Sequence, residues 1–112
     1  MSIAARSTVI SNGTSLSAAV LVGDHTLVSI QMPSTWTSAS LTFQASVDGI
    51  TYQNVYSSTG TELTLTAAAS TYIYLDPAIF SGAIKIKVRS GTSGAAVNQG
   101  GDRTLWLAMK QV

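Results

Sequence analysis

Along this chain, apolar and polar residues alternate in short runs that are separated by turn dipeptides. The run from Leu41 to Val47 is the clearest, because every second residue in it is apolar. A period of two places alternate side chains on opposite faces of a β-strand. No segment longer than ten residues has the apolar spacing of an amphipathic helix. The alternation therefore predicts an all-β chain.

Turn signals divide the chain every eight to twelve residues, which is typical of an antiparallel β-sandwich or jelly roll of about eight strands. Asn12-Gly13 predicts a hairpin turn between strands 4–10 and 16–22. Asp76 and Pro77 predict one helical turn at 76–80, as N-cap and first helical residue. The remaining expected strands are 26–32, 41–47, 52–56, 62–66, 71–75, 84–89 and 104–111.

The 112 residues predict a single domain over 1–112, because two hydrophobic cores would not fit comfortably. An N-terminal arm (1–6) and a Gly-rich loop (91–101) are expected to extend from the sandwich. The core is predicted from the inward set of each alternating strand. Its expected members are Val28, Ile30, Leu41, Phe43, Val47, Leu63, Leu65, Ile73, Leu75, Ile84, Ile86 and Val88.

The inventory of reactive side chains is small and argues against catalysis, a metal site and a bound cofactor. The chain has no cysteine and one histidine, His25, which follows Asp24 directly. Adjacent residues of a strand point to opposite faces, which disfavours an Asp–His relay. Asp48 is explained by its hairpin turn, because a calcium loop brings several carboxylates together. We therefore expect neither an enzyme nor a metalloprotein.

The charge balance disfavours nucleic acid as a partner. Six Lys and Arg residues against five Asp and Glu residues give a formal net charge of +1, whereas nucleic-acid binders concentrate many cations. No run approaches the roughly 20 apolar residues of a membrane helix, and the N-terminus lacks the apolar segment of a secretory signal. Polarity comes instead from 16 Ser and 14 Thr, which can enter a protein interface without the cost of burying charge.

Two sets of residues are candidates for an interaction surface. Tyr72 and Tyr74 share one face of their expected strand, and such a pair serves either a protein interface or a sugar-stacking platform. Trp36, in a Ser/Thr-rich loop, has the same two interpretations. Lys85, Lys87 and Arg89 share a face of another strand; they are either a solvated or edge-protecting row or a surface for an acidic partner.

Four stretches resemble small proteins encoded in the structural gene clusters of tailed phages and prophages. They are residues 11–17, 32–44, 46–52 and 88–93, with the sequences SNGTSLS, MPSTWTSASLTFQ, SVDGITY and VRSGTS. Some of these proteins resemble capsid decoration, or cement, proteins with a jelly-roll fold. The resemblance implies a chain that lies on the outside of an icosahedral shell, contacts the major capsid protein and forms dimers or trimers. It implies no catalytic, metal or cofactor residue.

The resemblance predicts a virion protein, made in the host cytoplasm, that stabilises the capsid exterior. The alternative is a carbohydrate-binding or adaptor module of a phage head or tail fibre. Under the first hypothesis, Trp36 and the N-terminal arm contact capsid or a sister copy, and the row of cations meets acidic residues at the rim. The full set of capsid or self-interface candidates is Ile3, Arg6, Trp36, Tyr72, Tyr74, Lys85, Lys87, Arg89 and Trp106.

Overall fold

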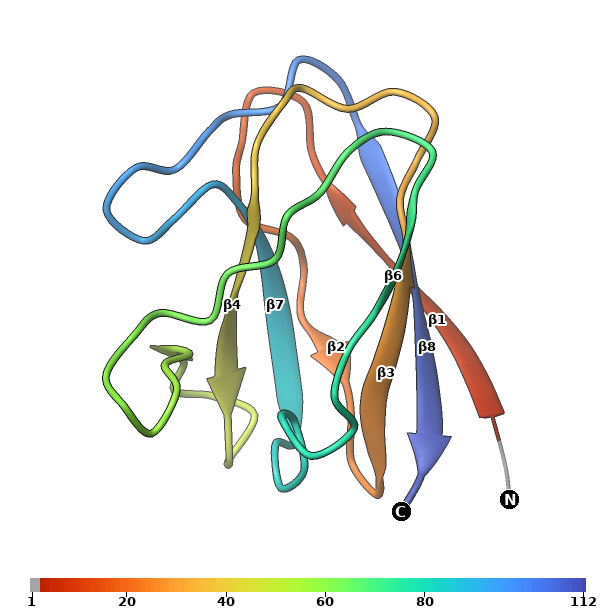
Figure 1. Cartoon of the computed structure of the whole chain (residues 1–112), viewed down its shortest axis with the longest axis vertical. Helices are drawn as coiled ribbons and strands as arrows, with labels where there is room; N and C mark the ends of the chain where they lie inside the picture. The colour runs from red at the N-terminus through yellow and green to blue at the C-terminus, as the bar shows by residue number, and fades with distance from the viewer. Residues whose placement is uncertain (1–2) are drawn as a thin grey trace.

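The computed structural model describes residues 3–112 as two four-stranded antiparallel sheets packed face to face (Figure 1). The chain is an all-β sandwich, as the alternation predicts. Sheet A contains, in spatial order, β1 (Ile3–Ile10), β8 (Arg103–Gln111), β3 (His25–Gln31) and β6 (Tyr72–Tyr74). Sheet B contains β2 (Val20–Leu21), β7 (Lys85–Ser90), β4 (Leu41–Ser46) and β5 (Gln53–Asn54).

The expected hairpin between strands 4–10 and 16–22 is wrong. Asn12-Gly13 does form a turn, in which Gly13 adopts a φ of 78°, but the chain then crosses to the other sheet. β1 pairs along its whole length with β8, whereas β2 pairs with β7. The Gly13 amide donates to the carbonyl of Gln99, 2.8 Å away, so a long-range contact fixes this turn. Only the β4–β5 connection stays within one sheet.

A β-bulge in β3 reverses part of its expected alternation. The pairing of β3 with β8 shifts register between Leu27 and Ser29, and such a shift changes which side chains face the core. Leu27 and Ile30 are both fully buried, whereas Val28 is only partly buried. The alternation in the sequence places Val28 and Ile30 on one face, because it gives no sign of the extra residue that the bulge inserts.

The core lies between the two sheets, where Phe43 and Phe80 meet edge to face with ring centroids 5.0 Å apart. Among the expected core residues, Ile30, Leu41, Phe43, Leu75, Ile86 and Val88 are buried, and Leu63, Leu65 and Ile73 are partly buried against the core. Val47 and Ile84 are exposed, so their assignment to the core is wrong. Core residues that the alternation missed are Ile10, Val20, Val22, Leu27, Met32, Phe80, Ala83, Leu105, Leu107 and Met109.

Several expected elements are shorter or of another kind. The 52–56 strand reduces to β5, and 62–66 contributes only isolated bridges. No helix occurs within residues 3–112, and 76–80 is a turn in which the Ala78 amide donates to the Asp76 carboxylate at 3.0 Å. A membrane-spanning helix is likewise not found within this described part of the chain.

The expected N-terminal arm is also wrong over 3–6, since these residues belong to β1. The rest of that expected arm, Met1 and Ser2, lies outside the described residues.

Candidate binding surfaces

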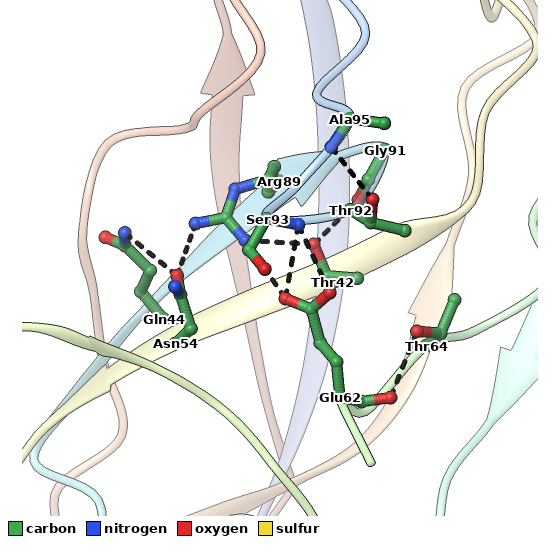
Figure 2. Close-up of polar contacts among 10 residues, drawn as sticks. All are labelled: Thr42, Gln44, Asn54, Glu62, Thr64, Arg89, Gly91, Thr92, Ser93 and Ala95. Atoms are coloured by element: carbon green, nitrogen blue, oxygen red, sulfur yellow. Dashed lines mark hydrogen bonds and ion pairs between the residues drawn. The ribbon is translucent and has the colours of Figure 1, made fainter.

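Arg89 is the centre of a buried polar cluster on the outer side of sheet B (Figure 2). Its guanidinium donates to Asn54 Oδ1 at 2.6 Å, to Thr42 Oγ1 at 3.3 Å and to Glu62 Oε2 at 3.4 Å. The Glu62 carboxylate also accepts the amide of Ser93, with both oxygens 3.2 Å away. Both members of the Arg89–Glu62 ion pair are therefore engaged by partners from the chain itself.

This cluster is structural, which corrects the interface role expected for Arg89. It joins the 53–64 segment and the start of the Gly-rich loop to sheet B. That loop turns sharply at Gly91, where φ is 89° and a Cβ would lie 2.6 Å from the Ala95 carbonyl oxygen. Arg89 is only 7% exposed and cannot meet an acidic partner at a rim.

Lys85 and Lys87 share the outer face of sheet B with Arg89, as the alternation predicts, but remain partly exposed. The Lys87 ammonium lies 4.4 Å from the centre of the Tyr52 ring, in a cation–π contact. β7 is an inner strand between β2 and β4. Protection of a free sheet edge therefore does not explain this row of cations.

Asp24 and His25 do contact each other, contrary to the strand-based expectation. Asp24 lies in the turn before β3, so its side chain is free to reach His25, with Oδ1 2.7 Å from Nδ1. Across residues 3–112, no group of three or more His, Asp or Glu side chains is placed to hold a metal ion.

One end of the sandwich exposes several large apolar side chains. We call this surface the apolar end and define it by Val47, Ile50, Ile79 and Ile84, which are 81%, 82%, 38% and 38% exposed. A groove of about 650 Å³ runs between the loop after β4 and the 79–83 segment. Both loops lie at the lower end of Figure 1, below β4 and β7.

A compact turn presents Val47 and Ile50 to solvent. The Asp48 carboxylate accepts the amides of Thr51 and Ile50 and the hydroxyl of Ser46, each at 2.8 Å. These bonds, led by the Thr51 amide, favour the charged form and lower the pKa of Asp48 from 3.8 to about 2. The expected turn role of Asp48 is confirmed, and the turn explains why Val47 leaves the core.

A second hollow lies on the outer face of sheet A. Gln31 of β3 is opposite Trp106 of β8 on one side and Tyr72 of β6 on the other. Directly opposed residues of neighbouring strands point to the same face. We call the resulting hollow the aromatic groove; it has about 560 Å³ and is lined by Gln31, Met32, Pro33, Ser34, Ser70, Thr71, Tyr72, Thr104 and Trp106.

The two tryptophans differ in environment. Trp36 is partly buried against the core and donates its indole N–H to the Ala39 carbonyl at 3.1 Å, so it is a poor candidate for a detachable contact. Trp106 is 47% exposed. Tyr72 and Tyr74 are exposed together with ring centroids 5.2 Å apart, which is one of the two arrangements that the sequence left open.

The other interface candidates lie along β1. Ile3 is 62% exposed at the start of the strand, while Arg6 is turned toward sheet B and donates to the Leu21 carbonyl. The structure thus brings Trp106, Tyr72 and Tyr74 onto one sheet face and keeps Arg89 and Trp36 apart from them. Sequence reasoning missed the apolar end, although the Asp48-Gly49 turn signal marked where the chain leaves the sheet.

Comparison of the chain with family models, curated proteins and solved structures found no match in any of the three.

Proposed function

We propose that this chain is a structural protein of a tailed-phage virion that binds the outer surface of the capsid and stabilises the shell. The apolar end carries the proposal. Val47 and Ile50 are each about four-fifths exposed beside an open groove, and an apolar patch on the surface of a small domain marks a protein contact. The proposed partner is the major capsid protein, which the resemblance of the sequence implies.

The architecture agrees with this proposal. Two four-stranded sheets joined mostly by connections that cross between them support assignment to the jelly rolls, which viral capsid and lectin domains use. A charge of +1 with hydroxyl groups as the main polar groups suits a contact that is mostly buried. Such a contact does not need charge to be removed from water.

Stabilisation would follow from contact with more than one capsid subunit. Free energy of binding to the closed shell adds to the cost of every opening event, and many weak copies act together. The apolar end can supply two contacts because Val47 and Ile50 belong to one loop and Ile79 to another. Lys85 begins the strand next to this end and is proposed to meet acidic capsid residues at the rim.

Self-association is proposed to use the free edge of β1. The other three outer strands, β2, β5 and β6, have only two or three residues, and short edges limit unwanted pairing. β1 has eight residues, and among residues 3–112 its backbone hydrogen-bonds to β8 alone. Antiparallel pairing of two copies along this edge would make a dimer. Ala5→Lys, which adds an edge charge, should leave only monomer in sedimentation at high concentration.

Binding to shells that lack the protein tests the capsid contact. Ile50→Asp should abolish co-sedimentation with shells, because a charge would have to leave water, while the melting temperature stays unchanged. Ser58→Asp is the matched control, since Ser58 is exposed in a different loop. Equal occupancy of both variants on the shell would rule out the apolar end as the contact.

Copy number separates this proposal from a fibre module. Hundreds of copies per particle are expected of a decoration protein, and a virion density map would show them on the capsid exterior. A few copies located on a fibre would contradict the proposal.

A further inference from the structure

We propose that the aromatic groove is a binding site for an uncharged saccharide. The site is separate from the apolar end, and its argument does not depend on the capsid contact. It rests on the chemistry of the lining, on the spacing of two aromatic side chains and on one strained residue in the wall.

No charged side chain lines the aromatic groove, which consists of one amide, several hydroxyls, two large aromatic rings, Met32 and Pro33. This composition gives a phosphate, a carboxylate or a cationic peptide no partner for its charge. A pyranose combines a face of C–H groups with a rim of hydroxyls. The lining offers the complementary pair of surfaces, aromatic rings for the C–H face and hydrogen-bonding groups for the rim.

The register of sheet A positions the aromatic rings. Trp106 and Tyr72 are each one strand away from Gln31, so their backbones are about 10 Å apart, with the amide between them. A sugar stacked on Trp106 can therefore reach the Gln31 amide. The Tyr72 hydroxyl lies 2.9 Å from Ser29 Oγ, a hydrogen bond that holds the Tyr72 ring in place before any ligand arrives.

The hydroxyls of Thr71 and Tyr72 are bonded within the chain, but other polar groups of the wall are available to a ligand. Within residues 3–112, no hydrogen bond from the chain engages the side chains of Gln31, Thr104 or Ser34, or the indole N–H of Trp106. The indole of Trp36, by contrast, is occupied by Ala39. The aromatic groove thus contains donors and acceptors that a ring of hydroxyls can satisfy.

Ser70 adds an independent indication. It is the only residue other than glycine with a positive φ, 59°, among the described residues, and strained backbone of this kind clusters at binding sites. Its amide donates to the Pro33 carbonyl at 2.9 Å, and the Met32 amide donates to the Thr71 carbonyl at 2.9 Å. These two bonds fix the wall of the aromatic groove and hold Ser70 at its edge.

Tryptophan fluorescence gives a direct test. In a Trp36→Phe background, Trp106 is the only indole. We would titrate this variant with maltotriose, cellotriose, N-acetylglucosamine trimer and mannotriose, on the order of 1 mM each. At least one should change the emission saturably, with an affinity that does not vary with salt, because no charge is involved. Calorimetry on the wild-type chain serves if Trp36→Phe fails to fold.

Variants locate the site. Trp106→Ala should weaken binding at least about tenfold and Gln31→Ala about threefold to tenfold. Sugar binding by Tyr72→Ala is compared with that of Tyr56→Ala as the control. Tyr56 and Tyr72 are 53% and 52% exposed, but only Tyr72 lines the aromatic groove. Ser70→Gly should raise the melting temperature and weaken binding. These responses should appear with no capsid present.

Several results would overturn the proposal. They are no response to any of the four sugars by either method, equal loss in Tyr56→Ala and Tyr72→Ala, or stronger and salt-dependent binding of trigalacturonate. Competition by a short peptide with no effect of any sugar would assign the groove to a protein partner instead. None of these outcomes bears on the apolar end, whose Ile50→Asp variant should bind the sugar normally.

Discussion

The apolar end and the aromatic groove both expose large apolar side chains, yet they differ in chemistry. The apolar end presents Val47, Ile50 and Ile79 beside a carboxylate that is already bonded within its own turn, whereas the aromatic groove has no charged side chain and places an amide and hydroxyls between two rings. Exposed apolar surface alone favours any dry contact. Polar groups set between apolar ones restrict the ligand to a matching pattern. Hydropathy therefore locates a surface, while the polar groups of that surface indicate what can bind there.

The most damaging change should be Phe80→Ala, which tests whether the apolar end and the aromatic groove are independent. Phe80 is 2% exposed, stacks edge to face on Phe43 and follows Ile79 in the chain. Loss of its ring should reduce the free energy of unfolding by about 3–5 kcal/mol, measured by urea titration. Where the variant remains folded, capsid binding should fall while sugar binding persists. Loss of both capsid binding and sugar binding in folded protein would show that the apolar end and the aromatic groove are coupled.

The next largest effect is expected from Arg89→Met, in a region that belongs to neither the apolar end nor the aromatic groove. This change leaves the Glu62 carboxylate, whose side chain is 13% exposed, without its charged partner, and should cost roughly 3 kcal/mol. The double variant Arg89→Met with Glu62→Leu should recover part of that loss. Both binding activities should remain in the folded fraction. A double variant less stable than Arg89→Met would contradict the assignment of the pair as structural.

A smaller and more selective effect is expected at Val47. Val47→Ser removes an exposed apolar side chain, so it should weaken shell binding several-fold while the free energy of unfolding changes by less than about 0.5 kcal/mol. Thr59→Ser, also in an exposed loop, is the control. A large loss of stability in Val47→Ser would mean that Val47 is a core residue after all.

The smallest effect concerns pH at the turn that supports the apolar end. The folded-state pKa of Asp48, about 2, lies below its ordinary value of 3.8. Its contribution to stability is therefore fully present above pH 3.8 and is lost as pH falls toward 2. Asp48→Asn should lower the melting temperature at neutral pH and remove this part of the acid dependence, so that the melting temperatures of the two proteins converge as pH falls toward 2. An identical acid profile in both proteins would show that the turn bonds are not formed in solution.

The alternation predicted strand positions well where a strand has one buried face. Phe43, Ile86 and Val88 are buried as their period of two requires. It failed at Val28, where a bulge shifts the register, and at Val47, which lies just beyond the last paired residue of β4. The alternation of side chains predicts neither the position of a bulge nor the last paired residue of a strand, because both depend on the partner strand.

The candidate surfaces were predicted only in part. Tyr72 and Tyr74 were named from the alternation of their strand and Trp106 as an aromatic side chain, and all three prove to be exposed on one sheet. Arg89 was expected at a rim and is buried. Nothing near Arg89 in the sequence indicates that Glu62 and Asn54 will cover it. The aromatic groove likewise joins residues near positions 31, 70 and 106, which only the sheet order brings together.

Local features of the sequence were enough to predict the all-β class, most of the strands, the turns at Gly13 and Asp48, and a surface with few charges. These properties follow from side-chain period, backbone preference and composition, all of which act within a few residues. Long-range packing sets the pairing of β1 with β8, the burial of Arg89 and the position of Gln31 between Trp106 and Tyr72. Each of these joins residues far apart in the chain, and only the packing of the two sheets selects among the possible partners.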